Sequence, residues 1–310
     1  RALNPETLEG VGMNDLCIRM DGVCKRYPHF SLDSVSLELP EGHVLGFIGA
    51  NGAGKSTTIR ILMGLVHQDA GSVQVLGHSM PAEQIAAKLD IGFVSEDMRL
   101  YGAATLAWHM DFVASMYPRW DQRYADSLLP RFDLKAQQKI KGLSHGQRVK
   151  AALLLALARQ PRLLILDEPT TGLDPVARRE VLGELMSVIT DEGRTILFSS
   201  HNTLEVEQIA DHIAFIDRGR LIALDEKESL LDRWRRVRLV VPPSIALPQL
   251  PGIVEVAGTE RLPVLTTSQF DPDVVSLCQN RRVTVQAVDS MTLEEIFVAN
   301  VQSRRELQPA

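Results

Sequence analysis

One glycine-rich segment restricts the fold of this chain more than any other feature. Residues 49–56 read Gly-Ala-Asn-Gly-Ala-Gly-Lys-Ser and fit the pattern G-x-x-x-x-G-K-[ST]. The apolar run "VLGFI" (44–48) before it predicts a buried strand, and apolar residues from 59 to 65 recur at helical spacing after it. Glycines admit positive φ, so such a loop can bring its amides and the next helix N-terminus up to a phosphate. A glycine-rich turn that binds nothing does not require this context, and we therefore expect a nucleoside triphosphate here.

The loop and the first helical turn supply the predicted phosphate ligands. Lys55 provides a positive charge for the β- and γ-phosphates, and the Ser56 hydroxyl is a candidate ligand for Mg²⁺. Thr57 offers a further phosphate contact. The predicted phosphate-binding residues are Gly49, Ala50, Asn51, Gly52, Ala53, Gly54, Lys55, Ser56 and Thr57.

A pair of acids follows a second buried strand. In "LLILDE" (163–168), four apolar residues precede Asp167 and Glu168. Ligands of α/β sheets bind at the carboxyl ends of the strands, where these two acids are expected. Asp167 is predicted to hold Mg²⁺, directly or through water, and Glu168 to activate a water molecule as general base. Two acids that merely cap the strand before Pro169 are the alternative, which the phosphate loop makes less favoured.

Strands and helices alternate after the phosphate loop, which predicts an α/β fold with a parallel sheet covered by helices. Before that loop, the polar–apolar alternation of "SVSLEL" (34–39) indicates a half-exposed antiparallel strand. A long helical stretch is expected from Thr105 to Phe132, broken near Pro118. The apolar run 151–158 is bounded by charged residues and is interpreted as a buried helix.

The chain is predicted to contain two domains. Residues 1–13 are excluded from the fold prediction as an N-terminal extension, because Met13 stands just before the first strand-like segment. Residues 14–232 form the first domain, with a helical subdomain at about 100–160. The pattern of alternating strands and helices ends at "DRWRRVR". Residues 233–310 are predicted to form a small α+β accessory domain.

These residues, with four more features in the right order, resemble the ATP-binding cassette (ABC) family. "LSHGQ" (143–147) is similar to the LSGGQ signature of that family, and "GLDP" (172–175) to its D-loop. His201 follows a buried strand as the switch histidine does, and Tyr27 stands where the family stacks an aromatic ring on adenine. The resemblance covers about residues 14–232. It implies a P-loop NTPase with a RecA-like core, an antiparallel β subdomain and a helical subdomain.

The resemblance also implies that part of the site comes from a second subunit. Ser144, His145, Gly146 and Gln147 of the signature would face the γ-phosphate bound by the partner cassette, and Asp174 of the D-loop would lie at the dimer interface. A role for Ser144 as an ordinary helix N-cap is compatible with this. His201 would contact the γ-phosphate of its own site, although histidines at strand ends are often structural.

Two residues depart from the family pattern. His145 occupies the second position of LSGGQ, which varies. Glu96 in "GFVSED" stands where the family usually has glutamine beside Mg²⁺ and the attacking water. Glu96 is predicted to ligate Mg²⁺, with added negative charge near the γ-phosphate. The alternative is a loop carboxylate that faces solvent.

The resemblance implies a Mg-dependent ATPase subunit that dimerises around two ATP molecules and drives a separately encoded membrane permease. The "YPRWD" segment and the ending "TLEEIFVAN" are similar to exporter-type cassettes, including those of bacterial antibiotic resistance and bacitracin export. Such a subunit is expected at the cytoplasmic face of the membrane. The partner cassette is expected to be a second copy of this chain, with a different cassette as the alternative. The sequence does not identify the transported substrate.

Composition and charge help to judge the alternative functions. The net charge is −6 and no apolar run approaches the about 20 residues of a membrane span. The three cysteines show no CxxC spacing. Cys17 and Cys24 are interpreted as core thiols of the strand region, with metal ligands or a disulfide as the alternative, in a reducing environment and a chain without a signal peptide. A soluble ABC ATPase acting on DNA or ribosomes is the alternative, but no coiled-coil insertion or basic linker is evident, so no nucleic acid partner is expected. The arginines of 233–238 are interpreted as a solvated hinge. A third hypothesis is a binding module without catalysis. Glu96 is the only residue that supports it.

Overall fold

The computed structural model describes residues 16–192 and 194–306. Its contacts divide the chain into two compact units, of which the first ends at Leu224 and the second begins at Asp225. The division therefore precedes the boundary expected after residue 232, and the predicted extension 1–13 lies outside the described residues. No helix in the described ranges has the length and apolar character of a membrane span.

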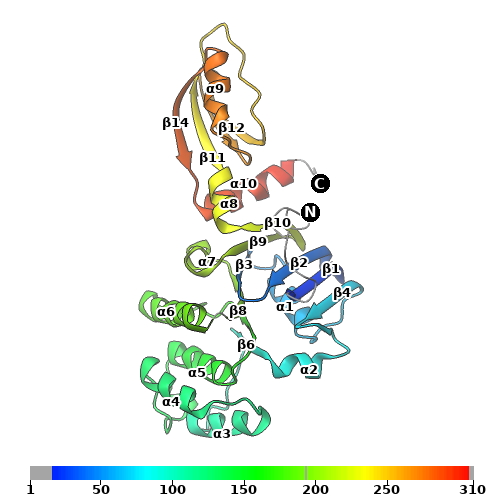
Figure 1. Cartoon of the computed structure of the whole chain (residues 1–310), viewed down its shortest axis with the longest axis vertical. Coiled ribbons are helices and arrows are strands. Elements are labelled where there is room, and N and C mark those ends of the chain that lie inside the picture. Colours follow the sequence, from blue (N-terminus) through cyan, green and yellow to red (C-terminus); the bar gives the residue numbers. More distant parts are fainter. Residues whose placement is uncertain (1–15, 193, 307–310) are drawn as a thin grey trace. The chain divides into compact units, whose positions relative to one another are not determined.

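A six-stranded sheet forms the centre of the first unit, with strand order β10-β9-β3-β8-β7-β6 (Figure 1). The neighbouring pairs from β9 to β6 are all parallel, as the alternation predicted. Every residue of β3, β7 and β8 is buried, which explains why these strands are largely apolar. The strands are β3 (Val44–Ile48), β6 (Ile91–Ser95), β7 (Leu163–Asp167), β8 (Thr195–Ser200), β9 (His212–Asp217) and β10 (Arg220–Glu226). Since β3, β7 and β8 run in one direction, the segments that follow them emerge at the same edge.

An antiparallel sheet with order β2-β1-β4-β5 packs over the phosphate loop and its helix. Its strands are β1 (Leu16–Tyr27), β2 (Phe30–Pro40), β4 (Ala70–Val75) and β5 (His78–Ser79). Val35, Leu37 and Leu39 of β2 are buried and alternate with more exposed neighbours, which confirms the half-exposed antiparallel strand. These side chains share one core with Phe47 of β3 and Ile59 of the helix after the loop.

Helices surround the parallel sheet, and α3, α4 and α5 lie together beyond its β6 edge (Figure 1). The helices of this unit are α1 (Lys55–Leu62), α2 (Gln84–Leu89), α3 (Leu106–Met116), α4 (Gln122–Arg131), α5 (His145–Leu157), α6 (Pro175–Glu192) and α7 (Thr203–Ile209). The predicted break near Pro118 is confirmed, because α3 ends at Met116 and Asp121 caps the start of α4. Residues 151–158 are buried on α5 and its C-cap, as expected.

The second unit is a four-stranded antiparallel sheet with order β12-β13-β11-β14 and three helices. Its own core includes Val237, Leu265 and Val274. The elements are α8 (Lys227–Arg233), β11 (Arg235–Val240), β12 (Ile253–Thr259), β13 (Leu262–Thr267), α9 (Asp273–Asn280), β14 (Thr284–Ser290) and α10 (Leu293–Glu306). The chain therefore has the α+β accessory unit that the sequence indicated.

The arginine-rich segment is not a solvated hinge, so that interpretation is wrong. Arg236 and Arg238 belong to β11 and form ion pairs with Glu295 and Asp289 of the same unit. The neighbouring Trp234 is 3% exposed. The segment is therefore part of a folded sheet whose charges are neutralised locally.

The cysteines form no disulfide in the described structure. Cys17 and Cys278 are buried, and Cys24 is half-buried. Burial raises the pKa of the Cys17 thiol to about 12, so it remains protonated and unreactive. The interpretation as a core thiol is confirmed for Cys17, whereas Cys24 is only half-buried.

Candidate phosphate-binding and hydrolytic site

The glycine-rich loop connects β3 to α1 in a conformation that only glycine adopts easily. Gly52 and Gly54 have φ of 78° and 117°. A Cβ atom added at Gly54 would lie 2.8 Å from the Leu32 side chain, so the loop also requires the small residue for space. α1 begins at Lys55, directly after the loop, and its N-terminus contributes amides that favour an anion. The backbone therefore fits a phosphate.

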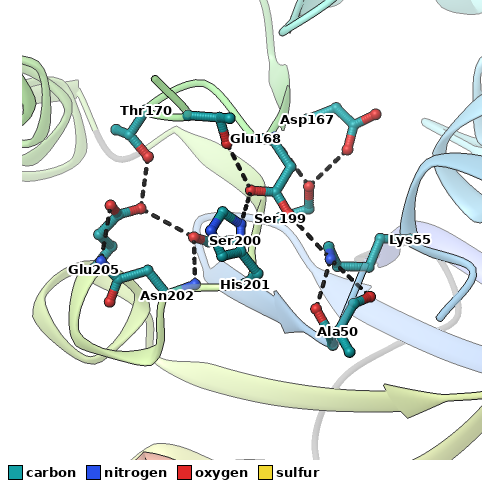
Figure 2. Close-up of polar contacts among 12 residues, drawn as sticks. Ala50, Lys55, Asp167, Glu168, Thr170, Ser199, Ser200, His201, Asn202 and Glu205 are labelled. Atoms are coloured by element: carbon teal, nitrogen blue, oxygen red, sulfur yellow. Dashed lines mark hydrogen bonds and ion pairs between the residues drawn. The ribbon is translucent and has the colours of Figure 1, made fainter. Parts of the chain in front are cut away.

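Lys55 is buried beside this loop, at 5% exposure. Its Nζ donates to the Gly49 carbonyl at 2.6 Å and to the Ala50 carbonyl at 3.3 Å. It also forms an ion pair with Glu168 Oε1 at 3.0 Å (Figure 2). The first turn of α1 thus places a cation at the predicted phosphate position, where a carboxylate neutralises it.

Glu168 brings the second charge of the site. It follows β7 with a φ of 52°, a strained conformation for a residue other than glycine. Its Oε2 accepts hydrogen bonds from His201 Nδ1 at 2.7 Å and from Thr171 Oγ1 at 3.0 Å. Burial opposes ionisation of this carboxyl, but Lys55 and His201 outweigh burial and hold its pKa below the ordinary value of 4.5. Glu168 is therefore a carboxylate at neutral pH.

Asp167 is held by a serine that the sequence analysis did not single out. Ser199 Oγ donates to Asp167 Oδ1 at 2.7 Å, and the Glu168 amide donates to the same hydroxyl at 3.1 Å. Asp167 is 8% exposed. The polar pair "SS" at the end of the apolar strand β8 was the signal for this role, because a buried hydroxyl needs a partner.

The donor set fits Mg²⁺. Asp167 supplies a buried, oriented carboxylate, and Ser56 supplies a hydroxyl from the first turn of α1. Mg²⁺ commonly combines one or two protein oxygens with water and substrate phosphates, and Asp167 and Ser56 can provide the two protein oxygens.

His201 lies directly after β8, as predicted, and its side chain is 49% exposed. Because Glu168 is ionised, the 2.7 Å contact requires the proton on Nδ1 of the ring. Nε2 is then the ring atom that remains for a ligand. The structure thus brings the predicted Lys55, Glu168 and His201 together, although they come from three separate segments (Figure 2).

The signature residues organise the start of α5. The Ser144 hydroxyl accepts from the Gln147 amide at 3.2 Å, while the Gln147 side chain accepts from the Ser144 amide at 3.1 Å. This capping box confirms Ser144 as an N-cap. His145 Nε2 donates to the Thr171 carbonyl at 3.0 Å, and Gly146 lies close to Ala177. His145 and Gly146 therefore lie against the segment that runs from Glu168 into the first turn of α6.

Asp174 and Tyr27 have local partners as well. Asp174 Oδ1 accepts from the amides of Val176 and Ala177 at 2.9 and 3.0 Å, and these bonds lower the pKa of its carboxyl. It thus caps α6. Tyr27 ends β1, is 42% exposed, and stacks on Phe30 with ring centroids 6.4 Å apart. An exposed ring near the phosphate loop is compatible with stacking on a base.

Glu96 lies just beyond β6, beside Asp167. Its amide donates to the Asp167 carbonyl at 3.1 Å, while its side chain is exposed. With Arg99, Arg148 and Glu168 it lines a cavity of about 80 Å³. Glu96 thus stands at the strand end where a Mg²⁺ ligand is predicted. Its carboxylate faces solvent, as in the alternative interpretation.

The network extends to Thr170 and Glu205. The side chain of Thr170 is only 2% exposed. Its hydroxyl donates to Glu205 Oε2 at 2.6 Å. Sequence reasoning missed Glu205, whose only signal was an acid between the buried Thr203 and Val206 of α7.

The comparisons with known proteins agree with this geometry. A family model described as "ABC transporter" matches residues 32–171. The chain is 32% identical over 304 residues to a daunorubicin resistance ATP-binding protein of Streptomyces coeruleorubidus, covering 92% of this chain and 96% of that protein. This chain belongs to the ABC transporter ATP-binding proteins. ATP is therefore the nucleotide of the site, and the chain is an ABC-type ATPase.

Other relatives of this ABC protein include a linearmycin resistance ATP-binding protein of Bacillus subtilis, 36% identical over 64% of this chain and 65% of that protein. A Nod factor export ATP-binding protein of Neorhizobium galegae is 36% identical over 65% of this chain and 59% of that protein. Among solved structures, an ATP-binding subunit of an ABC transporter superimposes with a TM-score of 0.64 and 26% identity, covering 70% of this chain and 92% of that one. The predicted fold is thereby confirmed.

Proposed function

We propose that this chain is the Mg-dependent, ATP-hydrolysing subunit of an exporter whose membrane-spanning permease is a separate chain. The observation that carries hydrolysis is the contact of Lys55, Glu168 and His201 at one edge of the sheet. The resistance and export functions in the names of its relatives support export. We assign the ATP chemistry to the unit that ends at Leu224 and an accessory role to the unit from Asp225.

The residues of the site divide the work of phosphoryl transfer to water. Glu168, kept ionised by its cationic neighbours, accepts a proton as the water oxygen attacks the γ-phosphorus. The bond to the β–γ bridging oxygen breaks, which releases ADP and phosphate. Lys55 and the loop amides stabilise the charge on the phosphates, and His201, when both ring nitrogens carry a proton, donates from Nε2 to the γ-phosphate while Nδ1 stays bonded to Glu168. Ser56 and Asp167 would hold Mg²⁺, which would supply further neutralisation of that charge.

A second cassette completes the site in this proposal. Ser144, His145, Gly146 and Gln147 begin a capped helix whose N-terminus would face the γ-phosphate bound by the partner. Asp174 would lie beside the same interface. Two ATP molecules would then join the subunits, and hydrolysis would release them. The partner is a second copy of this chain or a related cassette.

A cluster of exposed aromatic side chains gives the permease a place to bind. Trp108 and Phe112 of α3 are 44% and 45% exposed and stack with centroids 5.2 Å apart at an interplanar angle of 6°. Tyr101, 69% exposed, meets the Trp108 ring edge-on. Exposed apolar patches of this kind mark binding surfaces. We assign this cluster to a cytoplasmic segment of the permease, which would hold the chain at the cytoplasmic face of the membrane.

Replacing both Trp108 and Phe112 by serine is expected to weaken binding of the permease by about 4 kcal/mol, or on the order of 10³-fold, and so to reduce its recovery with this chain at least about tenfold, because hot-spot aromatic residues contribute about 2 kcal/mol or more each. The measurement is co-purification with the tagged chain from detergent-solubilised membranes of the native host. Ile85→Ser on α2 is the matched control, since Ile85 is exposed at 82% but lies outside the cluster.

The same experiment tests the proposed function as a whole. A stoichiometric multi-span protein that depends on Trp108 and Phe112 supports the exporter. Recovery of the wild-type chain with ribosomes or nucleic acid instead would contradict the exporter and favour the soluble alternative, with the ATP chemistry unchanged.

Glu96→Gln is expected to leave ATP affinity within about twofold and to change kcat severalfold, because the substitution removes a charge beside Asp167 while keeping the side-chain shape. ATP hydrolysis measured over a range of Mg²⁺ concentrations checks this, with Glu83→Gln, an exposed acid on another loop, as control. A rate and a Mg²⁺ dependence equal to those of the wild type would remove Glu96 from the metal side of the site.

A further inference from the structure

Glu205 is a buried carboxylate to which the proposed hydrolysis assigns no role. It lies on α7, and its side chain is only 5% exposed. Burying a carboxylate is unfavourable unless charges and hydrogen bonds compensate for the lost water. The partners of this side chain therefore indicate why it is there.

Each oxygen of Glu205 has two partners. Oε2 accepts hydrogen bonds from Thr170 Oγ1 at 2.6 Å and from Ser200 Oγ at 3.0 Å. Oε1 accepts from Asn202 Nδ2 at 3.2 Å and pairs with Arg178 Nε at 3.0 Å. Figure 2 shows Glu205 between the segment of Thr170 and the segment of Ser200 and Asn202.

These partners are neighbours of the two proposed hydrolytic side chains. Ser200 and Asn202 flank His201 on both sides, and the Asn202 amide also donates to Ser200 Oγ at 3.0 Å. Thr170 is two residues beyond Glu168. One carboxylate therefore holds together the two segments whose side chains meet in the 2.7 Å contact between His201 Nδ1 and Glu168 Oε2.

The fourth partner connects this arrangement to α6. Arg178 lies in the first turn of that helix, just after Asp174, which caps it. A shift of the start of α6 would therefore act directly on the Glu205 carboxylate. Asp174 is the residue that we place beside the partner cassette.

We propose that Glu205 is a positioning residue for ATP hydrolysis, which sets Glu168 and His201 relative to each other and connects both to the start of α6. The proposal rests on the hydrolytic roles assigned above. A purely structural role would not require these four polar contacts, because well-packed apolar residues replace buried ion pairs without loss of stability in many proteins.

The test compares Glu205→Ala with Glu205→Gln. Glutamine keeps the shape: its oxygen can accept from Arg178 and Asn202, and its amino group can donate to the hydroxyls of Thr170 and Ser200. Alanine removes all four contacts and leaves the buried hydroxyls of Thr170 and Ser200 without their acceptor. Gln208→Ala, an exposed position on the same helix, is the matched control.

Glu205→Ala is expected to lower kcat at least about tenfold with KM for ATP within about twofold, because small displacements of reacting groups have large effects on rate. Glu205→Gln is expected to stay within about threefold of the wild type. The Gln rescue and the unchanged KM distinguish positioning from a merely structural role.

Thr170→Val gives a second measurement with little change of shape, should Glu205→Ala not fold. It removes one hydrogen bond to Oε2 and is expected to lower kcat by less than Glu205→Ala does. An unchanged kcat in whichever of these variants folds would overturn the proposal. The proposal would also be overturned if the fraction of Glu205→Ala protein able to bind ATP fell as much as its kcat.

Glu168→Gln serves as the reference that separates the two levels of inference. If Glu168→Gln abolishes hydrolysis while the Glu205 variants match Gln208→Ala, the hydrolytic assignment stands and the positioning role fails. If Glu168→Gln hydrolyses ATP normally, the hydrolytic assignment itself fails, and the positioning role fails with it.

Discussion

Glu168→Gln is expected to bind ATP and to hydrolyse it on the order of 10²- to 10⁴-fold more slowly than the wild type, the usual contribution of a general base. The substitution preserves the shape of the side chain and its capacity to bond with His201 and Thr171. What it removes is the negative charge that can accept a proton from water.

ATP affinity should not fall in this variant, and we expect it to rise. Lys55 is paired with Glu168 at 3.0 Å in the structure, so phosphate competes with a carboxylate for the ammonium group. A neutral glutamine competes less. Since binding is retained and hydrolysis is blocked, the proposed ATP-joined dimer should accumulate.

Three measurements check this prediction: equilibrium ATP binding, single-turnover hydrolysis, and the mass of the ATP-bound species by light scattering. Glu38→Gln on β2, whose side chain lies 3.8 Å from that of Arg19 on β1, is expected to keep kcat within about twofold. Normal turnover by Glu168→Gln would show that another group acts as the base. Slow turnover without dimers would leave the base in place and contradict the ATP-joined dimer.

The parts of this site that could be predicted from the sequence are those that local patterns encode. A glycine-rich loop, a strand that ends in two acids and a strand that ends in histidine are each readable within about ten residues. The parallel sheet then brings them to one edge, because the carboxyl ends of parallel strands coincide. Lys55, Glu168 and His201 could therefore be predicted to meet before any coordinates were known.

The contacts that orient these side chains could not be predicted in this way. Ser199 holds Asp167 across 32 positions of the chain, and Glu205 holds Thr170 across 35. Nothing local distinguishes a glutamate that is 5% exposed from one on a solvated helix face, because its burial depends on α6 packing beside α7. The interpretation of residues 233–238 as a solvated hinge is wrong for a related reason, since Arg236 and Arg238 are paired with acids distant in sequence.

Lys55→Met is expected to weaken ATP binding by about 1.5–3 kcal/mol, or about 10- to 150-fold, the usual effect of losing a hydrogen bond from a charged group. Methionine keeps an unbranched side chain of similar length, so the loop can stay closed around it. Hydrolysis should fall further than binding, because the ammonium also stabilises the charge that develops in the transition state.

The same substitution should change how stability depends on pH. In the wild type, the pKa of Glu168 lies below its ordinary value of 4.5, so this carboxylate stabilises the folded state above that pH. The contribution is lost as the pH falls through the lowered pKa. Without Lys55, burial is opposed by His201 alone, and the pKa of Glu168 should rise. The variant should therefore be most destabilised at neutral pH and recover relative to the wild type as the pH falls toward 5.

Urea unfolding at pH 7.5 and pH 5 measures this effect, and the double variant Lys55→Met/Glu168→Gln isolates its cause. If the loss at pH 7.5 comes from a buried carboxylate without its cation, the neutral glutamine removes that carboxylate and should restore most of the lost stability. A double variant no more stable than Lys55→Met would show that the 3.0 Å pair does not control the charge of Glu168. Restored stability with ATP binding still weak would separate the two functions of Lys55: it neutralises Glu168 before ATP arrives and binds phosphate afterwards.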